Sequence, residues 1–292
     1  MQSPILPKWI RSQLPSATAV QAVGRGTYGK GLATVCKEAR CPNQGKCIER
    51  RTATFLILGN RCTRNCSFCG IAHGVPSGPD PEEPRRVAEA VDSLGLRHTV
   101  ITSVTRDDLS DGGAFVFAET VHSIRNMVPE TSIEMLVPDF QGSLVALEMI
   151  ANAEPDVVGH NLEMVPRLYP SLRPNASYSR SLRVLEIFSI QAPGAIVKSG
   201  IMVGLGETAA ELKGLMNDLA STGCRVLTIG QYLRPTERQV PVERYVSLEE
   251  FEDLRELAIS LGIACVVAGP LVRSSYDSET ILRKLKSVIH KT

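Results

Sequence analysis

The stretch TATFLILGNRCTRNCSFCG, residues 52–70, joins an apolar run to a loop that contains three cysteines. Its first part, TATFLILG (Thr52–Gly59), is rich in β-branched and large apolar residues, which is typical of a buried strand. The loop that follows places Cys62, Cys66 and Cys69 with three and then two residues between them. The stretch therefore predicts a metal-binding loop directly after the first strand of the fold.

Strand-like runs and helices with one apolar side alternate from this stretch onward. The predicted strands are residues 52–59, 98–104, 132–140, 156–161, 196–205 and 225–233, and the predicted helices are residues 83–94, 113–127, 143–152, 179–191, 208–222 and 247–261. Consecutive strand–helix units of this kind indicate a parallel sheet with right-handed crossover connections.

The predicted fold class is α/β, with a partial (β/α)6 barrel of the TIM type. We prefer a barrel because candidate functional residues repeatedly follow the ends of strands, where barrel active sites lie. A doubly wound open sheet is the alternative. We expect residues 1–51 to form an irregular N-terminal extension, residues 52–263 the barrel, and residues 264–292 a C-terminal helical extension.

Length, charge and hydrophobicity restrict the class of protein. The chain has 292 residues, 43% of them hydrophobic, which is enough to bury a sizeable core. It carries 32 Lys+Arg against 31 Asp+Glu, and this balance gives no general attraction to nucleic acid or to an anionic membrane. No apolar run approaches the ~20 residues that a spanning helix needs, and the N-terminus lacks the apolar region of a secretion signal. We expect a soluble cytoplasmic protein without nucleic-acid or membrane partners.

The eight cysteines are unevenly distributed, because six of them lie between Cys36 and Cys69. In a reducing compartment such crowding indicates metal ligation or catalysis rather than disulfides. Three thiolates can hold three irons of a 4Fe–4S cluster and leave the fourth iron open for a ligand. Half of a zinc site is the alternative, although the spacing of Cys62, Cys66 and Cys69 fits it poorly.

This cysteine loop resembles that of the radical S-adenosylmethionine superfamily. The resemblance rests on the spacing, on Phe68 before the last cysteine and on the position after the first strand. It implies that the open iron binds the amino and carboxylate groups of S-adenosylmethionine and delivers an electron to its sulfonium. The radical chemistry then belongs to the cofactor, while the protein positions the reactants.

A second group, Cys36, Cys41 and Cys47, has four and five residues between its members. Soft thiolate ligands favour a cluster or zinc here as well. The alternative is a structural zinc ion that takes Cys224 or Cys265 as its fourth ligand. Otherwise we expect these last two cysteines to be inert buried thiols.

From about residue 30 to Tyr276 the chain resembles the lipoyl synthase family. The motifs that carry this resemblance are EARCPN, TATFLILGNRCTRNCSFC, TSVTRDDLSDGGA (102–114), HNLEMVPRLYP (160–170), KSGIMVGLGET (198–208), TIGQYLRPT (228–236) and GPLVRSSY (269–276). The resemblance implies a second 4Fe–4S cluster on Cys36, Cys41 and Cys47, with Ser275 rather than Ser274 as its fourth ligand. A serine oxygen is a harder ligand than a thiolate, which suits a cluster that gives up its sulfur. Capping of the final helix is the other role open to these serines.

The resemblance also implies a reaction and its partners. A 5′-deoxyadenosyl radical would abstract hydrogen from C6 and C8 of an octanoyl-lysine, and the second cluster would supply two sulfur atoms. The implied partners are an octanoylated lipoyl carrier domain, an electron donor such as a ferredoxin or flavodoxin, and iron–sulfur assembly proteins. A two-cluster radical enzyme of the methylthiotransferase type is one alternative. A non-catalytic zinc or redox scaffold is an alternative of a different class.

Polar residues after the predicted strands are candidate contacts to S-adenosylmethionine. The candidate set is Phe68, Thr102, Asp108, Asn161, Glu163 and Arg173. Asp108 or Asn161 could bond ribose hydroxyls, although a helix cap is equally consistent for Asp108. Arg173 could pair with a carboxylate or face solvent. Residues 204–207 (GLGE) either contact the cosubstrate or form a helix turn, and we expect His160 to be structural.

Overall fold

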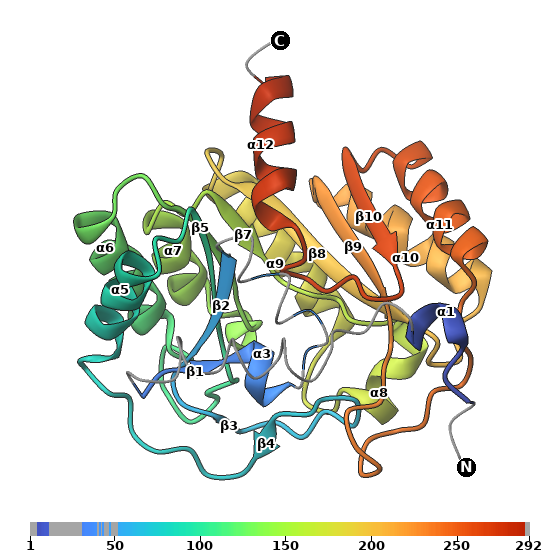
Figure 1. Cartoon of the computed structure of the whole chain (residues 1–292), viewed down its shortest axis with the longest axis horizontal. Coiled ribbons are helices and arrows are strands. Elements are labelled where there is room, and N and C mark those ends of the chain that lie inside the picture. Colours follow the sequence, from blue (N-terminus) through green and yellow to red (C-terminus); the bar gives the residue numbers. More distant parts are fainter. Residues whose placement is uncertain are drawn as a thin grey trace.

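The structure is a computed structural model, and it describes residues 5–11, 31–39, 41, 43, 47 and 52–289. They form a curved sheet with helices on its outer face (Figure 1). What the sequence predicts for the remaining residues of 1–51 and for residues 290–292 lies outside the described part.

Eight strands make up the main sheet. They are β1 (Ala33–Thr34), β2 (Thr52–Ile57), β5 (His98–Ser103), β6 (Ser132–Leu136), β7 (Val157–Gly159), β8 (Ile196–Val203), β9 (Val226–Gln231) and β10 (Cys265–Gly269). The strands lie side by side in chain order; β2 to β10 are parallel, and β1 is antiparallel to β2. A doubly wound sheet would reverse its strand order at a switch point. The observed order excludes that alternative and confirms a partial barrel, whose described edge strands are β1 and β10.

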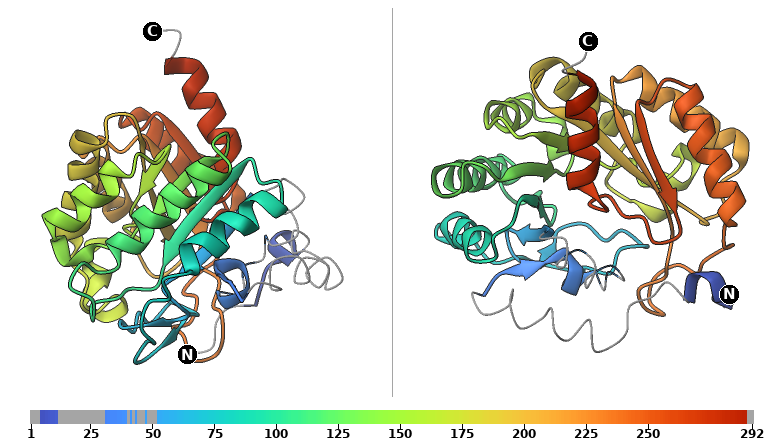
Figure 2. Two further views of the ribbon diagram at one scale, coloured as in Figure 1. Left: turned by 90° about the vertical axis from the view of Figure 1, so that its left-hand side faces the viewer. Right: turned by 45° about the horizontal axis from the view of Figure 1, so that its top comes forward.

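Helices cross the outer face between successive strands (Figure 2). They are α5 (Glu83–Ser93), α6 (Ala114–Met127), α7 (Leu144–Asn152), α9 (Tyr178–Gln191), α10 (Ala209–Ser221) and α11 (Leu248–Ser260). Each agrees with a predicted helix to within a few residues. Within the described ranges, no helix has the length and apolar composition needed to cross a bilayer.

Local sequence signals define the ends of these helices. Thr208 accepts a hydrogen bond from the backbone of Glu211, whose carboxylate bonds back to the backbone of Thr208, and Ser247 and Glu250 repeat this capping box at α11. Beyond the end of α10, Gly223 has φ +80°, a conformation in which a side chain would be strained. These signals act within a few residues, which explains why the helices are predictable from the sequence.

The strand β10 is an addition to the predicted fold. The sequence assigns its residues to the C-terminal extension, but they pair in parallel with β9 as a seventh parallel strand. Three of its five residues are only half-buried, so it lacks the continuous burial of the inner strands. The predicted final helix is confirmed as α12 (Ser278–Ile289), which lies at the opposite end of the molecule from β3 (Arg61–Cys62) and β4 (Ala72–His73) (Figure 1).

Candidate active site

The loop with Cys62, Cys66 and Cys69 lies at the carboxyl end of β2. It begins with β3, which pairs with β4, and the sulfur of Cys62 accepts backbone N–H bonds from Arg64 at 3.4 Å and Thr105 at 3.3 Å. Backbone groups from the loop and from the end of β5 thus hold the sulfur of Cys62 in place.

A cavity beside this loop is built from the ends of β2, β5, β6 and β7. The predicted residues that line it are Cys62, Cys66, Cys69, Phe68, Thr102, Asn161, Glu163 and Arg173. They come from four separated parts of the chain, so the barrel brings together the set that the sequence could only place after strands. The cavity occupies the end of the barrel at which active sites form.

The predicted contact Asp108 does not lie in this cavity. Its carboxylate accepts two hydrogen bonds from Arg106, both at 2.8 Å, and 38% of its side chain is exposed. Arg106 is buried and also donates to the carbonyl of Leu58. The geometry therefore assigns Asp108 to the support of the loop rather than to the cavity wall.

One wall of the cavity carries a cation, a carboxylate and an amide. Arg173 donates to the carbonyl of Asn161 at 3.1 Å and to the hydroxyl of Tyr169 at 3.0 Å, and Asn161 donates to Glu163 at 3.0 Å. Burial raises the pKa of Glu163, against the opposing charge of Arg173. Glu163 has φ +69° and is held there by a backbone bond to Gly200. Strained backbone of this kind is common at functional sites.

The buried Oδ1 atom of Asn161 accepts no hydrogen bond from the described residues. An unsatisfied buried acceptor costs about 1–3 kcal/mol. A hydroxyl donor from a bound molecule would remove this cost. The cavity thus suits a molecule with an amino-acid group and hydroxyls, as S-adenosylmethionine has.

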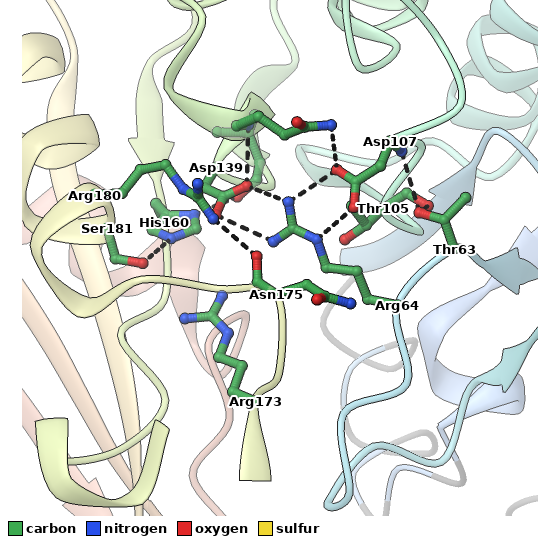
Figure 3. A network of polar contacts seen from close by, with 12 residues as sticks. Thr63, Arg64, Thr105, Asp107, Asp139, His160, Arg173, Asn175, Arg180 and Ser181 are labelled. Atoms are coloured by element: carbon green, nitrogen blue, oxygen red, sulfur yellow. Dashed lines mark hydrogen bonds and ion pairs between the residues drawn. The ribbon is translucent and has the colours of Figure 1, made fainter. Parts of the chain in front are cut away.

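A charge network that the sequence analysis missed supports the cysteine loop (Figure 3). Arg64 donates to Asp107 at 2.7 and 2.8 Å and to Asp139 at 3.1 and 2.7 Å, while Arg180 donates to Asp139 at 2.8 Å. Burial alone would raise the pKa of Asp139, but the hydrogen bonds and charge of Arg64 hold it below its usual value. The sequence did offer a signal for this network: Arg64 lies between two cysteines, and Asp107 and Asp139 each follow a strand.

His160 has the structural role expected from the sequence. It is 1% exposed, and its two ring nitrogens bond the carbonyl of Val137 at 2.8 Å and the hydroxyl of Ser181 at 2.9 Å. Burial lowers its pKa to about 4, and the positive charge of Arg173 acts in the same direction. The neutral ring thus forms part of the cavity wall.

The turn at residues 204–207 is held by its own glutamate. The carboxylate of Glu207 accepts the backbone N–H groups of Gly204 at 2.6 Å and Leu205 at 2.9 Å. These residues do not line the cavity beside the cysteine loop. The motif therefore forms a folded turn that leads into α10.

The thiols of Cys41 and Cys47 lie within electrostatic reach of Cys36. Burial, together with the neighbouring thiols of Cys41 and Cys47, raises the pKa of the Cys36 thiol to about 12. Several negative charges in one buried place are unfavourable unless a cation is present. The donor set therefore fits a metal cluster, which would supply that positive charge.

Segments from the two ends of the chain meet at this second group. Asn43 donates to the carbonyl of Leu271 at 2.6 Å, across 228 residues of sequence. Cys47 and Ser275 line one cavity, whereas the hydroxyl of Ser274 accepts a bond from Asn161 at 2.6 Å. The two neighbouring serines are thus directed to different sites.

Among the described residues, no three His, Cys, Asp or Glu side chains converge on a single metal-ion position. The assignment of clusters rests instead on the grouping of the thiols, on the adjoining cavity and on the relatives of the chain. Cys224 is buried and donates to the carbonyl of Val226 within its own strand region, as expected for an inert thiol.

The parallel partial barrel and the cysteine loop at its carboxyl end define a radical S-adenosylmethionine protein, and residues 56–219 match the model of the Radical SAM superfamily. A lipoyl synthase of Rubrobacter xylanophilus is 51% identical over 93% of this chain and 85% of its own length. A lipoyl synthase of Desulfotalea psychrophila is 49% identical over 95% of this chain and 93% of its own length. The chain therefore belongs to the lipoyl synthase family, which uses S-adenosylmethionine and two 4Fe–4S clusters.

A solved structure of methylornithine synthase has the same fold. It superposes with a TM-score of 0.54 over 96% of this chain and 91% of its own, at 15% identity. This similarity extends the agreement in fold to nearly the whole chain.

Replacing Arg64 should destabilise the fold near the loop. In Arg64→Met the buried Asp139 keeps Arg180 and the backbone N–H of Gln141 but loses one of its two arginines, and an incompletely paired buried charge costs about 3 kcal/mol. Urea unfolding of the cluster-free protein measures this loss. Arg85→Met is the control, since its exposed ion pairs with Glu82 and Glu89 should contribute less than about 1 kcal/mol. Equal stability of both variants would contradict the role of the network.

His160 should make folding sensitive to acid. The unfolded histidine takes up a proton below about pH 6.5, while the native ring resists protonation until about pH 4. The contribution of His160 to the free energy of unfolding is therefore fully present above pH 6.5, and it falls by on the order of 3 kcal/mol as the pH drops to 4. Unfolding free energies of the protein and of His160→Gln across this range should diverge. Parallel pH profiles would contradict the assignment.

Proposed function

We propose that this protein inserts two sulfur atoms at C6 and C8 of an octanoyl chain that is amide-linked to a lysine of a lipoyl carrier domain. The observation that carries the proposal is the presence of two cysteine triplets whose sites are joined through Asn161. The Nδ2 group of Asn161 donates to Glu163 in the cavity beside the first triplet and to Ser274 in the segment next to the second. An acyl chain placed between the two sites would be close to both.

The first site would hold a cluster on Cys62, Cys66 and Cys69 with S-adenosylmethionine beside it. When bound, the two clusters would supply the electron for reductive cleavage of S-adenosylmethionine and the sulfur atoms for insertion. Arg173 would pair with a carboxylate, and the Oδ1 atom of Asn161, which accepts no hydrogen bond from the described residues, would accept a ribose hydroxyl. Phe68, Thr102 and Glu163 would form the remaining contacts.

The second site would hold a cluster on Cys36, Cys41 and Cys47, with Ser275 as the fourth ligand. Ser275 shares a cavity with Cys47, whereas the hydroxyl of Ser274 is already bonded to Asn161. This difference supports Ser275 as the ligand. The residues on both sides hold the reactants in a fixed arrangement, and such positioning can supply a large part of catalysis.

The finer assignments of partners and location belong to the same proposal. The reductive step requires an electron donor such as a ferredoxin or flavodoxin, and rebuilding of the sulfur-donating cluster requires iron–sulfur assembly proteins. Both are expected in the cytoplasm. In this proposal, residues 1–51 carry the cysteines of the second cluster and residues 52–263 form the barrel. Residues 264–292 form the extension that carries the two serines.

Loss of one triplet should separate the two activities. Cys41→Ala should lower the iron content after anaerobic reconstitution from about eight to about four per chain. Cleavage of S-adenosylmethionine should persist, while mass spectrometry of an octanoyl-lysine peptide should show no added sulfur. Cys66→Ala should abolish both activities. If Cys41→Ala abolishes cleavage as completely as Cys66→Ala does, the proposed division is wrong.

The two serines should behave differently. Ser275→Ala should release iron from the second cluster to a chelator faster than the unaltered protein does, because one ligand is lost. Ser274→Ala keeps the ligand and removes only a hydrogen bond of about 1 kcal/mol, so its release rate should change less than about tenfold. Chelation followed by absorbance measures both rates. The reverse order would make Ser274 the ligand.

A further inference from the structure

A charged cluster lies inside the barrel, outside the cavities that the two cysteine groups line. Lys198 on β8 donates to the two carboxylate oxygens of Glu134 on β6, at 2.9 and 3.0 Å, and to the hydroxyl of Ser278 at 2.7 Å. The side chains of Lys198 and Glu134 are 4% and 1% exposed. Neither lines the cavity beside the cysteine loop.

The three contacts use the full donor capacity of Lys198. An ammonium group has three N–H donors, and here they meet three different oxygens. Burial alone would raise the pKa of Glu134, but the charge of Lys198 dominates and lowers it to about 2, so the pair is ionised. Ser278 therefore supplies the acceptor that the ion pair lacks.

A buried ion pair is weak evidence for stability, because apolar residues of similar volume often serve as well or better. The best-attested use of such groups is to fix one arrangement among several. Here the arrangement concerns α12, whose first residue is Ser278. The pair distinguishes one placement of this helix from others that its apolar face would allow.

Apolar contacts hold α12 against the sheet but do not fix its position along the strands. Its side chains pack on Val157, Ile196 and Val226, the first residues of three neighbouring strands. The packing residues of α12 are Ile281, Leu282 and Leu285. Apolar packing is not directional, so a helix held only in this way could shift. The buried bond of Ser278 to Lys198 defines where the helix begins. The ion pair of Glu279 with the exposed Arg97 adds little.

The start of α12 lies three residues after Ser275. The connecting segment is held on one side by the bond of Ser274 to Asn161 and on the other by the bond of Ser278 to Lys198. A shift at Ser278 would therefore move Ser275 relative to Cys47, with which it shares a cavity.

We propose that Lys198, paired with Glu134, is a positioning residue for the second cluster: it fixes Ser278 and so holds Ser275 beside Cys47. The inference rests on the proposed function of Ser275 as a ligand. It adds a control of that ligand by a buried ion pair between β6 and β8.

The test uses the full chain and a variant without the buried charges, Lys198→Met with Glu134→Leu. This pair removes the bond to Ser278 without leaving an unpaired charge, so the cluster-free variant should unfold at about the same temperature as the parent. After anaerobic reconstitution we expect the iron content to fall from about eight to about four per chain, since one cluster of four irons is lost. Cleavage of S-adenosylmethionine should remain. Lys213→Met, on the exposed side of α10, is the control and should keep both clusters.

A second variant keeps the test decisive if the double variant does not fold. Ser278→Ala should raise hydrogen exchange at the start of α12 and chelator release of iron from the second cluster, each about fivefold, the factor expected for one hydrogen bond. Ser278→Thr keeps a hydroxyl and should restore both rates. Unchanged exchange and release in Ser278→Ala, or full iron content in the double variant, would overturn the proposal. Failure of the proposed function itself is distinguishable, because then the parent protein would show no second cluster.

Discussion

Like charges that share a buried place repel each other, and both cysteine groups of this chain face that constraint. Burial raises the pKa of Cys66 to about 11 and of Cys69 to about 12, so each thiolate needs a positive charge nearby. Each group has an arginine within electrostatic reach: Arg173 acts on Cys66, and Arg273 acts on Cys41. The fold thus supplies part of the positive charge and leaves the rest to the clusters. Placement of these arginines in turn requires the barrel and its C-terminal segment.

The parts of the fold that were predictable are those coded locally. The spacing of Cys62, Cys66 and Cys69 and the capping boxes of two helices each lie within a few residues. The strand β10 was missed although residues 263–268 (IACVVA) form an apolar run. It lies at an edge of the sheet, and only its pairing with β9, which the sequence does not specify, adds it to the barrel.

The site was predictable by region but not by side chain. Asp107 and Asp108 are neighbours after the same strand, yet Asp107 bonds Arg64 under the cysteine loop and Asp108 bonds Arg106 beside it. No local pattern separates the two, because the choice depends on where a distant arginine lies. The same holds for Asn43, whose partner Leu271 is 228 residues away.

An incomplete barrel gives room for the C-terminal segment. A closed barrel fills its interior with layers of side chains, whereas here the chain returns past the inner strands after β10. Glycines permit this return: a Cβ atom on Gly230 would lie 2.1 Å from the carbonyl oxygen of Val272, and one on Gly200 would lie 3.1 Å from the hydroxyl of Ser274. The glycines, the buried Lys198 and the open sheet thus act together, since each is needed for the serines to reach a site whose cysteines come from the other end of the chain.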